Sequence, residues 1–438
     1  KGDLFESAQA RLDSMHSIVF GPETPADGSN NWVIGSDKSN SGNALLANDP
    51  HLGLSNPAIW YYVEMDSKQG DGDLHAAGAS VPAVPWVVVG HNENLALGVT
   101  TARMDLTDLY VETLNEEGDA VMFNGQEVPI ETKEFTFEVY NGESVTETFE
   151  YVPHHGPIIS KDVENQRAVS LRWSLHQPGD DIGFLYDLME SSNVDEAMSA
   201  VEKVGAINQS FVFIDTDDNI GWYPHSEVPS RPWASSETPN WLPVPGDGSA
   251  EWDGYLSNDQ LPKLKNPAGG YIATANNDFD GSFADGDPTN ESHPVWQASA
   301  AYGARHARIS NEIEKTDEHT LETINELQAD TKMLHAEQIV PEVISVADNN
   351  SGELSDREGN VLTALKDWDY TCPTGLNGDN PTDSAKANGD VAAESIGCSA
   401  FHVMVVQLTD AVFQDELAEL DDSIHWARLQ VPLRDIFV

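Results

Sequence analysis

Short runs of β-prone residues alternate with Gly, Asn and Asp over roughly the first half of the chain. Such runs, bounded by turn-forming residues, are typical of strands joined by tight connections. The pattern predicts a sheet-rich region with mostly antiparallel connections that begins at Ser29 and ends near Ile220. The expected strands cover residues 31–35, 44–47, 59–65, 86–89, 95–100, 109–113, 135–139, 169–173 and 211–214.

The pattern changes twice further along the chain. Six prolines at positions 224 to 245 are expected to break any regular element there, and the tryptophans among them indicate a loop packed on the surface. After Arg305, apolar residues recur at helical spacing, so we predict a mainly helical C-terminal third. A Gly/Asn/Asp-rich stretch at 375–390 interrupts it as a loop, and residues 3–15 are a short amphipathic helix candidate.

Acidic residues dominate the charge of the chain. It carries 74 Asp and Glu against 22 Lys and Arg, a formal net charge of −52, which excludes nucleic-acid binding through a basic surface. The content of core-forming residues is that of an ordinary globular protein, so the acidity does not indicate disorder. An acidic coat with little Lys resembles proteins of salt-loving organisms, in which high salt screens the self-repulsion.

Three further features bound the class of protein. No apolar run reaches the ~18 residues of a transmembrane helix, so we expect no membrane span. The chain starts at Lys1, which fits a leader that was removed or left out and leaves the compartment open. Cys372 and Cys398 exclude a disulfide framework, and both a single disulfide and a pair of buried free thiols remain open.

The candidate chemistry centres on a serine at the start of the first expected strand. Ser29 follows Gly28 and precedes Asn-Asn-Trp-Val-Ile-Gly, and alone such a Ser is usually structural. Five further motifs follow it in order, and the whole series is specific. They are Asn-Asp-Pro-His-Leu-Gly at 48–53, Gly-His-Asn at 90–92, Gly-Val-Thr-Thr at 98–101, Asp-Leu-Thr-Asp at 105–108 and Tyr-Ile-Ala-Thr-Ala-Asn-Asn at 271–277.

This series resembles the penicillin acylase family of N-terminal-nucleophile (Ntn) hydrolases, from about Gly28 to Arg308 and more loosely beyond. The resemblance implies an α+β fold, a four-layer α/β/β/α sandwich of two mainly antiparallel sheets plus a helical C-terminal region. It also implies a precursor that cuts itself between Gly28 and Ser29 into a small and a large subunit. Residues 1–28 would then end the spacer, 29–310 would form the core of the large subunit, and 311–438 its incomplete helical region.

The resemblance places the nucleophile and the oxyanion hole on three residues. The hydroxyl of Ser29 needs a base, and an α-amino group with a pKa near ~7.7–8 is suited to that task at neutral pH. Only a chain that begins at Ser29 has that base, so cleavage would switch the enzyme on. The backbone N–H of Thr101 and the side-chain amide of Asn276 would stabilise the oxyanion.

Two more residues would support this centre. The resemblance gives His51 the task of orienting the nucleophile, although a lone histidine is more often a structural hydrogen-bonding group. Arg308 would brace Asn276 and the amine, with Arg305 as a rival and a helix-surface ion pair as the ordinary alternative.

A structural Ca²⁺ is the only cofactor that the resemblance implies, and no organic cofactor is expected. Asp105 and Asp108 flank the carbonyl of Thr107 in a pattern that resembles the family's calcium site. Hard oxygen ligands suit Ca²⁺, but a complete site needs six to eight of them. Gln297 stands where a further ligand would be expected, and another would come from the small subunit. In so acidic a chain, two nearby Asp can also be coincidence.

The family's acyl pocket maps onto Leu52, Val89, Val99 and Ile207. Aliphatic walls cannot supply the aromatic edge contacts that favour a phenylacetyl group, so a fatty acyl chain is expected, although such residues commonly lie in a core. The expected reaction is hydrolysis of an N-acylated amine, such as a penicillin or an N-acyl-homoserine lactone, with the chain's own small subunit as partner. The alternative is a non-catalytic acidic module, binding calcium or acting at a surface, on the same fold.

Overall fold

The structure is a computed structural model in two compact units. The first contains Lys1–Ala301 and Thr316–Thr320, and the second Tyr302–Lys315 and Leu321–Val438; each is described by itself. The expected loop at 375–390 and most of the expected spacer lie outside the described residues. The structure describes residues 4–5, 7–8, 10–11, 28–53, 56–177, 179–283, 287–301, 303–350, 352, 354–372, 396–405 and 407–408.

A three-stranded antiparallel sheet carries Ser29. Its central strand β1 (Gly28–Ile34) lies between β18 (Tyr271–Thr274) and β2 (Leu45–His51). The apolar end of β1 is fully buried, which fixes the strand in the core. The register places Gly28 opposite His51, so the end of β2 lies beside the junction between Gly28 and Ser29.

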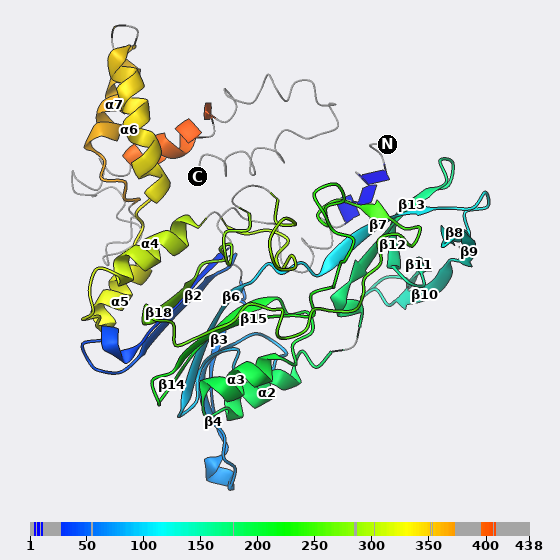
Figure 1. Ribbon diagram of the computed structural model, residues 1–438, viewed down its shortest axis with the longest axis horizontal. Helices are drawn as coiled ribbons and strands as arrows, with labels where there is room; N and C mark the ends of the chain where they lie inside the picture. The colour runs from blue at the N-terminus through cyan, green and yellow to red at the C-terminus, as the bar shows by residue number, and fades with distance from the viewer. Residues whose placement is uncertain are drawn as a thin grey trace. The chain divides into compact units, whose positions relative to one another are not determined.

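A seven-stranded antiparallel sheet packs against the first. Alternate residues of its strand β14 face opposite ways: Val212 meets Val33 of β1, while Phe211 and Phe213 pack under two helices. Figure 1 shows these helices, α2 (Gly183–Glu190) and α3 (Val194–Val201), beside β14. In spatial order the strands are β17 (Leu264–Lys265), β15 (Ile220–His225), β14 (Gln209–Asp215), β6 (Leu95–Thr101), β5 (Val89–His91), β4 (His75–Ser80) and β3 (Tyr61–Asp66).

A helical layer, a large sheet and the nucleophile sheet thus follow one another, and the predicted α+β fold with mainly antiparallel sheets is confirmed. The first unit also contains three short 3-10 helices, Ser36–Lys38, Lys68–Gly70 and Ser174–His176.

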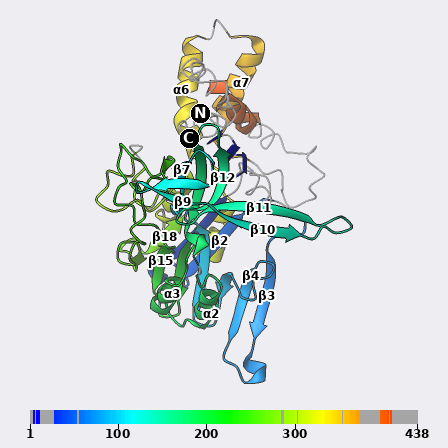
Figure 2. The ribbon, with the colours of Figure 1, turned by 90° about the vertical axis from the view of Figure 1, so that its right-hand side faces the viewer.

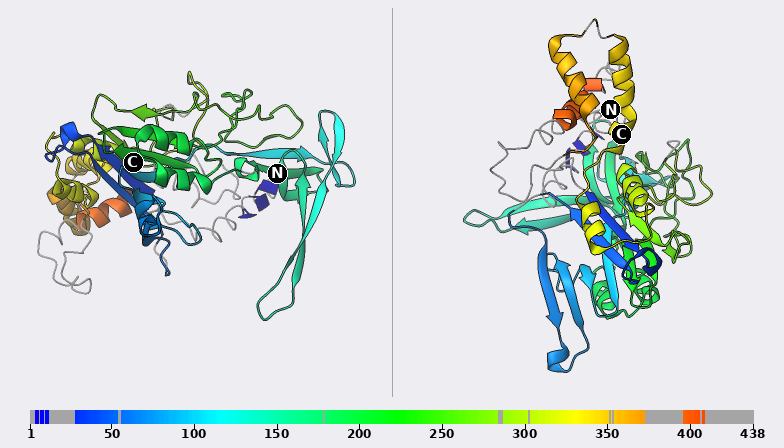
Figure 3. Two further views of the ribbon diagram at one scale, coloured as in Figure 1. Left: turned by 90° about the horizontal axis from the view of Figure 1, so that it is seen from below. Right: turned by 90° about the vertical axis from the view of Figure 1, so that its left-hand side faces the viewer.

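A third sheet completes the first unit. Its β10–β11 hairpin extends away from the other strands (Figures 2 and 3). Residues 4–5, 7–8 and 10–11 are helical, as predicted, and Leu4 packs on the β12–β13 pair. The strands, in spatial order, are β10 (Glu131–Phe137), β11 (Val145–Val152), β12 (Gly156–Asp162), β13 (Arg167–Trp173), β7 (Thr107–Thr113) and β16 (Val244–Pro245), with the hairpin β8 (Ala120–Phe123) and β9 (Gln126–Pro129) beside them.

The second unit is helical, as the apolar spacing predicts. A disulfide joins Cys372 to Cys398, which decides between the two alternatives for these cysteines. No helix among the described residues is long and apolar enough to cross a membrane. The helices are α4 (Ala304–Ile313), α5 (Leu321–Gln328), α6 (Leu334–Asn349) and α7 (Asp356–Asp367), and residues 396–405 and 407–408 are also helical.

Three expectations from the sequence are wrong. Helices α2 and α3 were not predicted, because each is only eight residues long and stands between strands. The expected strand at 86–89 begins only at Val89. Pro224 does not break the chain but lies in β15, opposite Ser210 of β14. It is tolerated because β17 pairs only with Gly221 and Trp222, so beyond them β15 is an edge strand.

Candidate active site

The side chain of Asn276 joins the predicted nucleophile to the predicted oxyanion hole. Its Oδ1 accepts a hydrogen bond from the amide N–H of Ser29 at 2.8 Å. Its Nδ2 donates to the carbonyl of Thr101 at 3.1 Å. Ser29 and Asn276 are both 4% exposed, so the Ser29 end of this bridge is shielded from water, whereas Thr101 at the other end is exposed. The structure therefore brings together three residues that come from three different parts of the sequence.

The backbone of Asn276 is in the left-handed region, with φ 59°. Asn is one of the few residues other than Gly that adopts this conformation routinely. The turn follows β18 directly, and β18 is the neighbour of β1, so pairing of these strands brings the amide side chain to Ser29.

The N–H of Thr101 points to an open edge of its strand. Ala102 N donates to Asn208 O, so Thr101, one residue earlier, directs its N–H away from β14. On that side β5 pairs with β6 only at Ala96 and Leu97. This orientation is what an oxyanion donor in the predicted role requires.

Asn48, which sequence reasoning did not assign, holds this edge in place. Its Nδ2 donates to Asn30 O at 3.0 Å and to Val99 O at 2.8 Å, and its Oδ1 accepts from Val99 N at 3.2 Å. One side chain thus ties the strand of Ser29 to the strand of Thr101. The only sequence signal was its place in the motif at 48–53.

Gln297 braces both halves of the predicted oxyanion hole. Its Nε2 donates to Ala102 O at 2.8 Å and to Asn277 O at 3.2 Å, the carbonyls that directly follow Thr101 and Asn276. Its Oε1 accepts from Phe279 N at 3.0 Å. Because the side chain is 4% exposed and hydrogen-bonded at both ends, Gln297 positions the site in this structure rather than facing a cation.

His51 lies at the end of β2, and its Nδ1 is 3.0 Å from Asp49 O. The carboxylate of Asp49 is 3.6 Å from the same nitrogen. These contacts fix the imidazole, and the β1–β2 register places the backbone of His51 opposite Gly28. The location agrees with a role in orienting the nucleophile, which stays a prediction.

Arg308 belongs to α4 of the second unit. Its Nη2 is 2.6 Å from Asp330 Oδ2, and its Nη1 forms an ion pair with Glu312. Burial raises the pKa of Asp330, but the hydrogen bonds from Arg308 and Lys332 and the charges of these two residues together lower it further, so the net shift is downward. Within its unit Arg308 thus forms the ion pairs of the ordinary alternative, and its bracing role stays a prediction.

Asp105 and Asp108 are buried around a guanidinium that sequence reasoning missed. Arg231 Nε donates to Asp108 Oδ2 at 2.7 Å, and its Nη1 lies 3.3 Å from Asp105 Oδ2. Asn240 also donates to Asp105, and Trp252 to Asp108. Two carboxylates therefore share one cation. Arg231 lies in the proline-rich segment, far from the aspartates in sequence, so no sequence pattern indicated that it contacts them.

Three of the four predicted acyl-pocket residues lie in one cluster. Val99 is buried in the core under α2 and α3, and Val89 and Ile207 pack against that core. Leu52, in contrast, is 39% exposed. Only three of the four residues could therefore line one aliphatic wall.

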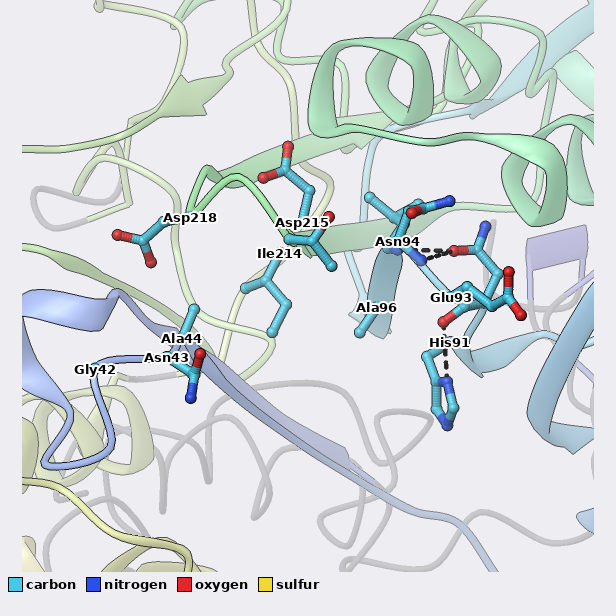
Figure 4. A pocket seen from close by; sticks show the side chains of 13 residues that line it. Gly42, Asn43, Ala44, His91, Glu93, Asn94, Ala96, Ile214, Asp215 and Asp218 are labelled. Atoms are coloured by element: carbon cyan, nitrogen blue, oxygen red, sulfur yellow. Dashed lines mark hydrogen bonds between the residues drawn. The ribbon is translucent and has the colours of Figure 1, made fainter.

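A cavity of about 300 Å³ opens at the other end of these strands. It is lined by Ala44 just before β2, Leu95 at the start of β6 and Asp215 at the end of β14, whereas Thr101 stands at the opposite end of β6. Figure 4 shows Asp215 and Asp218 on one side of it and His91 and Glu93 on the other. The cavity therefore does not serve Ser29.

Packed antiparallel sheets, with a buried Ser at the start of a strand and an amide side chain held on its nitrogen, are the arrangement that the resemblance to Ntn hydrolases predicts. The family model described as penicillin amidase matches residues 3–435. The chain belongs to the penicillin amidase family.

Similar proteins agree with this assignment. The chain is 32% identical over 264 residues to acyl-homoserine lactone acylase QuiP of Pseudomonas aeruginosa, covering 57% of this chain and 30% of that protein. It is 31% identical over 297 residues to the penicillin acylase 2 proenzyme of Pseudomonas sp., covering 66% of this chain and 37% of that protein. The chain thus spans about a third of the length of these relatives.

A solved structure shows the same fold. Thermostable penicillin G acylase from Alcaligenes faecalis superposes with a TM-score of 0.66 at 24% identity. The match covers 79% of this chain and 60% of that one.

Proposed function

We propose that the mature protein hydrolyses the amide bond of N-acylated amines through a covalent acyl intermediate on Ser29. The observation that carries this proposal is the bridge made by Asn276, which holds the nitrogen of Ser29 at 2.8 Å and reaches Thr101 at 3.1 Å. The names of the relatives, acyl-homoserine lactone acylase and penicillin acylase, supply the substrate class.

The reaction has two stages, the acylation of Ser29 and the hydrolysis of the acyl-enzyme. Ser29 Oγ attacks the acyl carbon while the α-amine of Ser29 takes the hydroxyl proton. The amide C–N bond then breaks, and the same amine delivers the proton to the leaving nitrogen. Water then attacks the resulting ester, the amine takes a proton from this water and returns it to Ser29 Oγ as the ester bond breaks, and the acid is released. An amide nitrogen carries two hydrogens, so Asn276 Nδ2 is suited to serve Thr101 O and an oxyanion together.

Cleavage between Gly28 and Ser29 would create the base. Within β1 the nitrogen of Ser29 is a backbone amide, which cannot accept a proton. Once the bond to Gly28 is hydrolysed, the same atom becomes an amine beside Asn276 Oδ1, and the existing hydrogen bond orients it. A precursor processed into two subunits agrees with the relative that is named a proenzyme.

We further propose a fatty acyl preference and a structural Ca²⁺. Val89, Val99 and Ile207 have aliphatic side chains in one shared cluster, and aliphatic walls favour an alkyl chain. For the cation, Asp105, Thr107 and Asp108 would be ligands. Asp108 Oδ1 and Asn240 Oδ1 are buried without a hydrogen-bond partner, and one guanidinium leaves the two carboxylates a net negative charge. These residues therefore fit a hard cation, which would cross-link this loop.

Intact-mass spectrometry of the complete precursor tests the proposal. The wild type and the control Ser80→Ala, a buried strand serine of β4, should both be cut between Gly28 and Ser29. Ser29→Ala should stay intact. An intact, folded wild type would refute autoprocessing.

Nitrophenyl amides of increasing acyl length then test the activity of the processed protein. We expect hydrolysis to rise from short to longer alkyl chains and to be weak for phenylacetyl. A processed protein that cleaves no member of the series would favour the non-catalytic module.

A further inference from the structure

A second cluster of chemically active side chains lies in the six-stranded sheet. Glu112 projects from β7, and His154 and His155 lie in the turn between β11 and β12. One ligand atom from each of the three residues lies within 4.8 Å of one from each of the others. The side chains of Glu112 and His155 are 0% exposed. None of these residues takes part in the chemistry proposed for Ser29.

Two atoms of this cluster are buried with no hydrogen-bond partner, Glu112 Oε2 and His154 Nε2. Leaving such a group unsatisfied is destabilising, so a carboxylate oxygen and an imidazole nitrogen without partners in one buried cluster need an explanation. The space beside Glu112 Oε2 also depends on Gly246, because a Cβ there would lie 2.3 Å from this oxygen. Both atoms are ligands that metals accept.

His155 has the surroundings of a histidine that binds a metal. Its Nε2 lies 2.7 Å from Glu251 Oε1, and Arg172 Nη1 holds the other oxygen of Glu251 at 2.9 Å. Metal-binding histidines almost always donate their second ring N–H to an acceptor, and a carboxylate such as Glu251 is one of the usual acceptors. Its Nδ1 then faces Glu112, 2.6 Å from Oε1.

We propose that Glu112, His154 and His155 bind one divalent transition-metal ion, with Zn²⁺ as the expected ion. The ligand atoms are Glu112 Oε2, His154 Nε2 and His155 Nδ1, and Glu251 supports His155 from behind. Two imidazole nitrogens and one carboxylate suit Zn²⁺, whereas Ca²⁺ requires oxygen ligands.

Binding requires a small contraction of the cluster. With metal–ligand bonds of about 2.0–2.1 Å, tetrahedral ligand atoms stand roughly 3.4 Å apart, so ligand atoms at the outer limit of 4.8 Å would approach each other by about 1.4 Å. The metal also replaces the proton that His155 Nδ1 shares with Glu112, and this proton is released to solvent. The ion would tie β7 to the β11–β12 turn, a structural role with a fourth position left for water.

Metal retention by the full chain tests this site. Protein stripped with EDTA is given Zn²⁺ in a buffer with excess Ca²⁺, which occupies hard carboxylate sites, and is then desalted. We expect about one equivalent of zinc by mass spectrometry, and visible d–d bands of a tetrahedral site when Co²⁺ replaces Zn²⁺.

Matched variants assign the metal to the cluster. His154→Ala should lose the retained equivalent and the Co²⁺ bands, while its melting temperature in EDTA stays that of the wild type. His75→Ala is the control, because His75 also lies near two carboxylates, Glu64 and Glu93, but is exposed. It should retain zinc as the wild type does. His154→Gln replaces His154→Ala if that variant does not fold.

Two results would overturn the proposal. One is a wild type that retains no zinc after desalting. The other is zinc retention in the folded His154 variant equal to that of His75→Ala. This test of the metal site does not depend on the role of Ser29, because zinc retention and the Co²⁺ bands are measured without amide hydrolysis.

Discussion

Replacing Asn276 by Asp separates the two tasks that its side chain performs. Asp is nearly isosteric and, like Asn, tolerates the left-handed backbone seen here at φ 59°. One carboxylate oxygen can still accept from the N–H of Ser29. The other replaces Nδ2 and faces Thr101 O, 3.1 Å away in the wild type, as a second acceptor. The nucleophile keeps its anchor, and the oxyanion loses a donor.

The magnitude follows from these two contacts. Loss of one oxyanion donor raises the barrier by about 2.7–4 kcal/mol, so we expect kcat to fall roughly 10²–10³-fold. The carbonyl of Thr101 loses Asn276 as its donor, and because Thr101 is exposed, the free energy of unfolding should fall only by the net contribution of one hydrogen bond, about 0.5–1.5 kcal/mol. Most of the catalytic loss should therefore appear in kcat, with KM much less affected.

The assay measures kcat and KM on a nitrophenyl amide, after intact-mass spectrometry has established how much protein is processed. Asn277→Asp is the matched control, because Asn277 Oδ1 accepts from Ala275 N and this acceptor is kept. The control should stay within a few-fold of the wild type. Processed Asn276→Asp with kcat within tenfold of the wild type would refute the oxyanion role.

Two further predictions concern stability. Burial raises the pKa of Asp215, but hydrogen bonds from Val194 and Asn219 outweigh it and the net pKa is lowered. Its stabilisation is thus present above the unfolded pKa of about 3.9 and is lost as pH falls through the lower folded value. Asp215→Asn should be less stable at pH 6 in urea unfolding, with the difference shrinking toward pH 3; a constant difference would contradict this assignment. With a net charge of −52, the protein should also lose stability when diluted from molar salt to about 0.1 M, while its preference among acyl lengths stays the same. An unchanged unfolding midpoint would remove the proposed adaptation to salt.

Local patterns predicted the strands and the motif residues well, but not their supports. Ser29, Thr101 and Asn276 could be found because each stands in a distinct short motif. Asn48 and Gln297 act through bonds to distant carbonyls, and no local pattern marks such a bond. Spacing alone also could not show that Arg231 would stand between Asp105 and Asp108, 126 and 123 positions away.

Secondary structure failed where tertiary context decides. Helix α3 begins at the cap Asn193, whose side chain accepts from Glu196 N, a local signal that could have been found. Pro224 could not be placed, because whether a proline is tolerated in a strand depends on which side of that strand is left unpaired.

The partners that meet at Ser29 are far apart in sequence: Asn276 lies 247 residues away. A ribosome delivers β1 long before β18, so the bridge cannot exist while the chain between them is still being made. If cleavage at Gly28 depends on this bridge, scission takes place only after the last strand has joined its sheet. The hydrogen bond between Ser29 and Asn276 would then set the time of cleavage, and every cleaved chain would be one in which β18 has already paired with β1.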